Sequence, residues 1–120
     1  MPNSHPIDPA KLRFTVGALT SVLAQRDYEA FCGFARASRL TPTDVDRVVR
    51  EYGRCLVPFS GPAFEAVDVV PISDCVPQRW SVVVHLWSKE EGRSDLSLEI
   101  TMQDSSTETY PVEIDDLHVL

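Results

Sequence analysis

The feature that most constrains the fold is a pair of alternating apolar segments joined by a short charged turn. The segments read "QRWSVVVHLWS" (78–88) and "DLSLEITM" (95–102), and the turn between them contains "KEEGR". Alternation with a period of two is typical of strands that bury one face, because successive side chains point to opposite sides of a sheet. The pair therefore predicts an antiparallel hairpin.

The two faces of this hairpin differ in composition. One face is apolar, so we expect it to pack against helices; it comprises Trp80, Val82, Val84 and Leu86 with Leu96, Leu98 and Ile100. The turn does not fix the register, and a slip of one residue would exchange the two faces.

The opposite face is too apolar for water and too polar for a core. It carries Val83, His85 and Trp87 on the first strand and Glu99 on the second. Aromatic side chains are enriched where one protein meets another, so we predict that these four residues form an interface. The simplest partner is a second copy, giving a symmetric homodimer. The alternative is that the N-terminal arm or the last strand shields Trp87 within the chain.

Three helices are predicted ahead of the hairpin from their capping residues. Asp8-Pro9 opens the first helix, and Asp27 opens a shorter second one. In "LTPTDVDRVVREYG", Thr41 caps the third helix and Gly53 ends it. The apolar residues of each helix recur at intervals of three or four, which is the spacing of one buried stripe.

Further strands are predicted at residues 64–72 and 110–120, after a connecting loop rich in proline and glycine at residues 53–63. Helices followed by strands indicate an α+β fold. We expect three N-terminal helices packed on one face of a curved antiparallel sheet of about four strands. Residues 1–7 are predicted to be a flexible arm, and residues 8–120 a single domain.

The net charge, the start of the sequence and the cysteine content limit the partners, the location and the metal sites that we expect. The net charge of −7 disfavours binding to nucleic acid or to an anionic membrane, because both repel an acidic surface. The start has no signal-peptide pattern and no apolar run is long enough to span a bilayer, so a cytoplasmic location is expected. Cys32, Cys55 and Cys75 are odd in number and widely spaced, which predicts free thiols and no metal site.

Two groups of residues could carry chemistry. His85 could form an acid/base dyad with Glu99, Asp115 or Asp116. Together with Glu113, the residues His85, Asp115 and Asp116 also make a candidate ligand or acidic site. The chain has no nucleophile motif, no phosphate-binding glycine loop and no H-x-x-x-H, so we assign no catalytic residue, no metal and no cofactor.

Two resemblances add to this interpretation. The element order across residues 8–120 is similar to the cystatin-like, nuclear-transport-factor-2-like architecture. The segments "LTPTDVDRVVREYG" and "YPVEIDDLHVL" resemble small uncharacterised bacterial domains of unknown function. The first resemblance implies a cone between helices and sheet, which holds small ligands or catalytic groups in some members. Other members are dimeric scaffolds or immunity proteins that neutralise toxins.

These observations favour a non-catalytic protein-binding domain of a bacterial type, with a toxin-neutralising immunity protein as one concrete version. The acidic surface would steer such a domain toward a basic partner. The alternative is a small cone-pocket enzyme or a carrier of a small-molecule ligand. A cavity lined by Tyr28, Tyr52, Trp80 and a buried carboxylate would favour the alternative, whereas a filled core with an exposed sheet patch would favour the binding domain.

Overall fold

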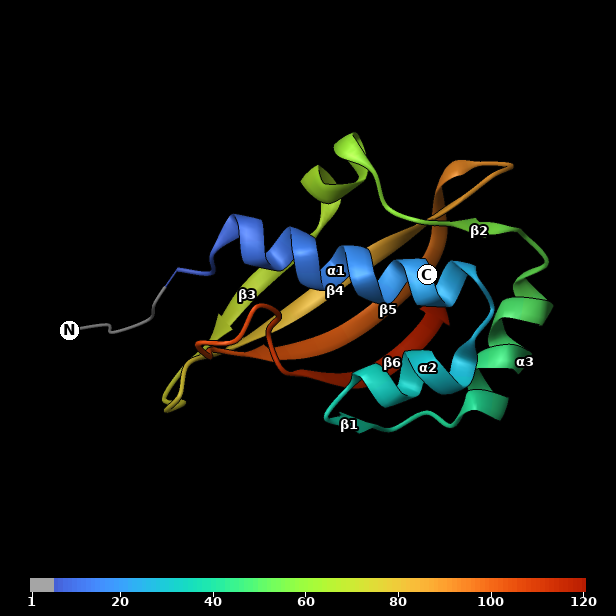
Figure 1. The fold of residues 1–120 in the computed structure, drawn as a ribbon. Helices are drawn as coiled ribbons and strands as arrows, with labels where there is room; N and C mark the ends of the chain where they lie inside the picture. The colour runs from blue at the N-terminus through green and yellow to red at the C-terminus, as the bar shows by residue number, and fades with distance from the viewer. Residues whose placement is uncertain (1–5) are drawn as a thin grey trace.

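A computed structural model of the chain describes residues 6–120, with the side chains of residues 62 and 65 left out. The fold is α+β, with the helices gathered over a curled sheet (Figure 1). In chain order the elements are α1 (Pro9–Ala24), α2 (Tyr28–Phe34), β1 (Ala37–Ser38), α3 (Pro42–Tyr52), β2 (Leu56–Val57), the 3-10 helix η1 (Gly61–Ala66), β3 (Asp68–Ile72), β4 (Arg79–Ser88), β5 (Gly92–Gln103) and β6 (Val112–Val119).

The strands form one mixed sheet of six strands in the order β1-β6-β5-β4-β2, with β3 also paired to β4. β1 runs parallel to β6, and the other pairings are antiparallel. The expectation of a purely antiparallel sheet of about four strands is therefore wrong. The two-residue strands β1 and β2 account for the difference, because a segment that short carries no periodic signal.

The three helices begin where the capping residues predict, although α2 ends at Phe34, before Arg36 and Arg39. The Asp8 side chain accepts hydrogen bonds from the first backbone N–H groups of α1. In α3, Thr41 and Asp44 form a reciprocal capping box, and Gly53 ends the helix at a φ of 74°. The expectation that all helices precede the sheet is wrong, since β1 lies between α2 and α3 and η1 follows β2.

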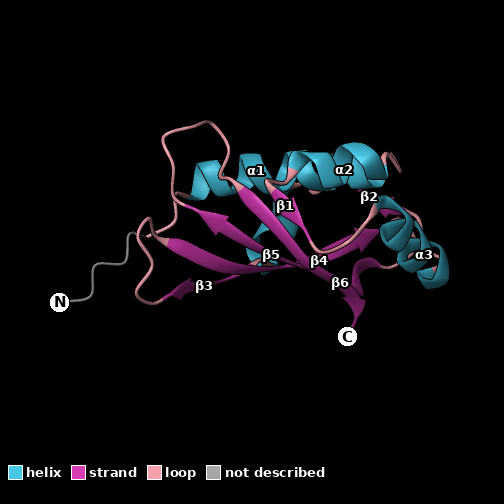
Figure 2. Cartoon of the chain, turned by 90° about the horizontal axis from the view of Figure 1, so that it is seen from below, coloured by secondary structure: helices cyan, strands magenta, loops and turns pink. Residues whose placement is uncertain are grey.

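The apolar face of the hairpin is the floor of the core, as predicted. Figure 2 shows α1 and α2 on one side of the sheet and α3 beyond one end. Every residue predicted for this face is at most 2% exposed: Trp80, Val82, Val84, Leu86, Leu96, Leu98 and Ile100. The side chains of α1 and α2 that face the sheet are equally buried, and Val16, Leu19 and Phe31 have no exposed surface. In the part of the chain that the structure describes, no helix lies across the opposite face of the sheet.

Several predicted boundaries change. The strand expected from residue 64 begins at Asp68, because residues 61–66 form η1, where Phe64 packs edge-on against Phe59 with ring centroids 5.4 Å apart. The expected loop at residues 53–63 contains β2. Of the predicted flexible arm, residues 1–5 lie outside the described residues, and Ile7 packs against the core.

Two register shifts interrupt the central strands. On β4 and β5, His85 lies opposite Ser97 but Trp87 lies opposite Arg93, so β5 carries extra residues at this point. The Ser94 hydroxyl lies in this bulge and donates to the Leu86 carbonyl at 2.8 Å, which satisfies a backbone group that the ladder leaves unpaired. A second shift between β5 and β6 lies next to Glu99. The three cysteines are free thiols.

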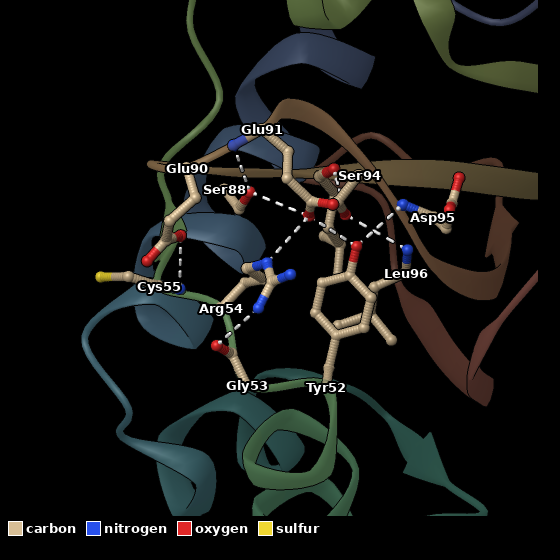
Figure 3. A network of polar contacts seen from close by, with 11 residues as sticks. Tyr52, Gly53, Arg54, Cys55, Ser88, Glu90, Glu91, Ser94, Asp95 and Leu96 are labelled. Carbon is tan, nitrogen blue, oxygen red and sulfur yellow. Dashed lines mark hydrogen bonds and ion pairs between the residues drawn. The ribbon is translucent and has the colours of Figure 1, made fainter.

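A polar network fastens the end of α3 to the β4–β5 turn (Figure 3). The Glu91 carboxylate accepts hydrogen bonds from the Tyr52 hydroxyl at 2.7 Å and from the Ser88 hydroxyl at 3.2 Å. The Tyr52 oxygen in turn accepts the Asp95 N–H at 3.1 Å. Arg54 adds an ion pair to Glu91 with an N–O distance of 3.9 Å. This network fixes the hairpin tip relative to the helices.

We predict that Tyr52→Phe lowers the free energy of unfolding by about 1 kcal/mol, because it removes a donor to a carboxylate and leaves the Asp95 N–H without its acceptor. Denaturant unfolding measures the change. Tyr28→Phe is the matched control, since the Tyr28 hydroxyl makes no hydrogen bond within residues 6–120. Equal unfolding midpoints for the two variants would show that the network does not stabilise the fold.

Candidate functional site

The candidate site is the side of the sheet that faces away from α1 and α2, which we call the open face. Its members follow from strand register and alternation. They are Asp68, Val70 and Ile72 on β3; Arg79, Ser81, Val83, His85 and Trp87 on β4; Arg93, Ser97, Glu99, Thr101 and Gln103 on β5; and Glu113, Asp115, Asp116 and His118 on β6. The structure thus places all four residues of the predicted interface on one face, with the register that the sequence favours.

The apolar part of the open face centres on neighbouring residues of β3 and β4. Val70 is 59% exposed, and Ile72 and Val83 are half-buried. Val83 lies opposite Asp68, and Val70 lies opposite Ser81, so the two valines are diagonal neighbours. Sequence reasoning placed only Val83 here, because it did not pair β3 with β4.

Trp87 is less exposed than the sequence suggests. It packs against the margin of the core, and a Cβ added at Gly92 would lie 3.6 Å from its ring. The opposite strand of the hairpin, rather than the last strand, therefore covers part of this ring. The indole N–H is buried and makes no hydrogen bond within the described residues.

His85 binds partners other than the predicted ones. Its Nε2 lies 3.1 Å from Asp68 Oδ2, and its Nδ1 lies 3.3 Å from the Ser97 hydroxyl. A neutral imidazole protonated at Nε2 satisfies both contacts, since it donates to the carboxylate and accepts from the hydroxyl. Glu99, Asp115 and Asp116 form no hydrogen bond or ion pair with His85 among the described residues. The contact with Asp68 could not be predicted, because the strand that carries Asp68 was expected to begin four residues earlier.

The residues Ser97, His85 and Asp68 have the composition of a nucleophilic triad but the reverse pattern of burial. In a working triad the serine is accessible and the carboxylate is buried. Here Ser97 is 0% exposed, whereas the Asp68 side chain is 69% exposed. A substrate cannot reach the Ser97 oxygen in this arrangement, so the chain of contacts orients His85 and provides no nucleophile.

His118 lies between two carboxylates on the same face. Its Nε2 is 3.3 Å from Glu99 Oε2, and its Nδ1 is 3.0 Å from Asp116 Oδ2. Both contacts have the distance of an ion pair but not the geometry of a hydrogen bond, and Nδ1 is a buried atom. One ligand atom from each residue lies within 4.8 Å of the others, and these are donor types that divalent metals accept. Each of the three side chains already has a neighbour at ion-pair distance, so their arrangement does not require a cation. Sequence reasoning gave no role to His118.

The predicted acidic site at residues 113–116 does not come together. Glu113 forms ion pairs with Arg36 and with Arg79, the latter at 2.8 Å. Asp115 accepts a hydrogen bond from the Thr101 hydroxyl at 2.7 Å, and Asp116 turns to His118. A bulge between β5 and β6 separates these carboxylates along the strand.

The open face is acidic as a whole. Glu113 is neutralised by its arginine partners, and Arg93 is the other cation on the face. The carboxylates without an arginine or lysine partner among the described residues are Asp68, Glu99, Asp115 and Asp116. An exposed apolar patch bordered by such carboxylates is suited to contact with a cationic surface.

Residues 21–120 match the family model of DUF7668, a domain of unknown function. The chain belongs to the DUF7668 family. The match begins within α1 and continues through β6, so it includes every residue of the open face. No curated protein and no solved structure gives a significant match. The helices that the structure describes in this DUF7668 domain are too short or too polar to span a lipid bilayer.

We predict that Glu113→Gln destabilises the DUF7668 domain by about 1 kcal/mol at neutral pH and by less in acid. The hydrogen bond from Arg36 is the main cause that holds the pKa of Glu113 below its ordinary value of 4.5. A carboxyl with a depressed folded pKa stabilises the fold fully above its unfolded pKa, and that stabilisation is lost as pH falls through the folded pKa.

Urea unfolding of parent and variant from pH 7 down to acid tests this. The difference between their unfolding free energies should shrink below about pH 4.5. A difference that stays constant with pH would show that the carboxylate is not stabilised by the two arginines.

Proposed function

We propose that this DUF7668 domain is a non-catalytic protein-binding domain whose partner presents a basic surface to the open face. The observation that carries the proposal is one sheet face, uncovered by the described helices, that combines an exposed apolar patch with unneutralised carboxylates. An interface needs both features, because apolar contact supplies affinity and charge supplies orientation.

The apolar contribution to partner binding would come from three side chains of the open face, Val70, Ile72 and Val83. These side chains are exposed or half-buried and do not pack against the core. Covering them would contribute roughly 3 kcal/mol at the usual coefficient for apolar area. That is a modest share of a stable complex, so polar contacts must supply part of the affinity.

The charge favours a basic partner over a second copy. In a symmetric dimer built on this face, Glu99, Asp115 and Asp116 would approach carboxylates of their own kind, and like charges across an interface are unfavourable. A cationic partner instead gains from the local charge and from the net charge of −7, which raises the rate of encounter at low salt. Self-association through the open face stays the second candidate.

A toxin-neutralising immunity protein is one concrete version of this proposal, since an acidic domain of this size suits a basic toxin. The bacterial source, the cytoplasmic location and the likeness to the cystatin-like architecture stay predictions that accompany it. The cone-pocket enzyme or ligand carrier has less support. The side chains between helices and sheet, including Trp80, are buried in a packed core, and the cavity described below is lined by Tyr28 but not by Tyr52 or Trp80.

The proposal is tested by selecting a displayed library of random peptides against the folded domain. Enriched peptides should combine lysine or arginine with an aliphatic or aromatic residue. Their affinity should fall about tenfold or more for Glu99→Lys, because the change reverses a charge at the contact. Glu51→Lys is the matched control, since it makes the same change at an exposed position of α3 and should leave affinity unchanged.

Enrichment of peptides without cationic residues, no enrichment, or equal losses in both variants would contradict the proposal. Sedimentation of the parent distinguishes self-association, and we expect a monomer. A dimer that dissociates in Val83→Lys would replace the basic partner with a second copy.

A further inference from the structure

A cavity of about 340 Å³ lies away from the open face and shares no residue with it. Arg26 lies in the turn between α1 and α2, and Tyr28 is the first residue of α2. Asp46 and Arg50 lie on α3. Arg54 precedes β2, and Glu90 follows β4. Its volume falls in the range of roughly 300–1,000 Å³ that holds small molecules.

Positive side chains gather around this cavity, although the chain as a whole is acidic. Arg26, Arg50 and Arg54 converge here in a protein whose net charge is −7. The two carboxylates that also line the cavity already have protein partners. Asp46 is paired with Arg50, and Glu90 accepts the Cys55 N–H at 2.9 Å, which is the main cause that lowers the pKa of Glu90. Glu90 therefore stays ionised at neutral pH.

Two donors in the cavity are left without protein acceptors. Arg26 makes no ion pair among the residues that the structure describes, and its backbone is held at a φ of 62°. This left-handed conformation follows the C-cap Gln25 and is a common way for a helix to end. The Tyr28 hydroxyl also lacks a hydrogen bond within residues 6–120. Burial raises the pKa of Tyr28, so this hydroxyl carries its proton and can donate it.

We propose that the cavity binds a small zwitterion of the amino-acid type, with its carboxylate on Arg26 and Tyr28 and its ammonium group directed toward Asp46 or Glu90. Guanidinium and phenol donors suit a carboxylate, and the acidic side chains of Asp46 and Glu90 suit a cation. They also disfavour a second negative charge, so a dianionic phosphate fits less well. Val49 provides apolar surface for the ligand side chain.

Four matched probes test this assignment: phenylalanine, benzoate, phenethylamine and phenyl phosphate. Each is titrated into isotope-labelled protein while NMR follows the backbone amides of Arg26, Arg54 and Cys55. Phenylalanine should give saturable shifts and the highest affinity of the four, because it alone carries both charges. Non-saturating shifts with phenylalanine, or equal or tighter binding of phenethylamine or phenyl phosphate, would overturn the proposal.

A pair of variants locates the site. Arg26→Gln should weaken phenylalanine binding about tenfold or more, which is the usual effect of losing a hydrogen bond from a charged group. Arg39→Gln is the control, because Arg39 is equally exposed and lies outside the cavity. Equal affinities of the two variants would overturn the assignment. Their unfolding midpoints confirm that both are folded, and this cavity is tested independently of the open face.

Discussion

The pairing of β4 with β5 is the interaction on which the rest of this structure depends. From Arg79 opposite Gln103 to His85 opposite Ser97, the two strands keep one register. That register directs one set of side chains under α1 and α2, where they are at most 2% exposed, and directs the alternate set outward. A slip of one residue would exchange the two sets of side chains. The same register therefore produces both the buried core and the polar open face.

Local departures from that register add polar contacts to the sheet. The extra residues of β5 beyond Ser97 bring the Ser94 hydroxyl to the Leu86 carbonyl. The shift between β5 and β6 brings both Asp116 and Glu113, which are three residues apart, opposite open-face residues of β5. Ion pairs at such exposed positions contribute little to stability. Carboxylates at these positions are thus available for recognition without a large effect on folding.

Features set by local sequence could be predicted, and features set by distant pairing could not. The ends of α3 follow from Thr41, Asp44 and Gly53, which act within one helical turn, and the buried face of β4 follows from simple alternation. β1 escapes prediction because its two residues pair with β6, far along the chain. The contact of His85 with Asp68 escapes for a related reason, since it requires β3 to pair with β4 from Asp68 onward.

The domain thus presents two surfaces of different chemistry. The open face offers apolar side chains bordered by carboxylates, and the cavity beside α3 offers arginines and a tyrosine hydroxyl. The network around Glu91 joins α3 to the hairpin, and the hairpin strands continue into the open face (Figure 3). A rigid connection of this kind holds both surfaces in fixed relation to one core.

The central claim is that the open face is uncovered in the free protein. Solvent paramagnetic relaxation of valine methyl groups measures this directly, because Val82, Val83 and Val84 are consecutive on β4 and serve as internal standards. Val82 and Val84 are fully buried, Val83 is half-buried on the open face, and Val70 is 59% exposed. We expect strong relaxation of the Val70 and Val83 methyl groups and weak relaxation of those of Val82 and Val84. Protection of Val83 and Val70 equal to that of their buried neighbours would contradict this claim.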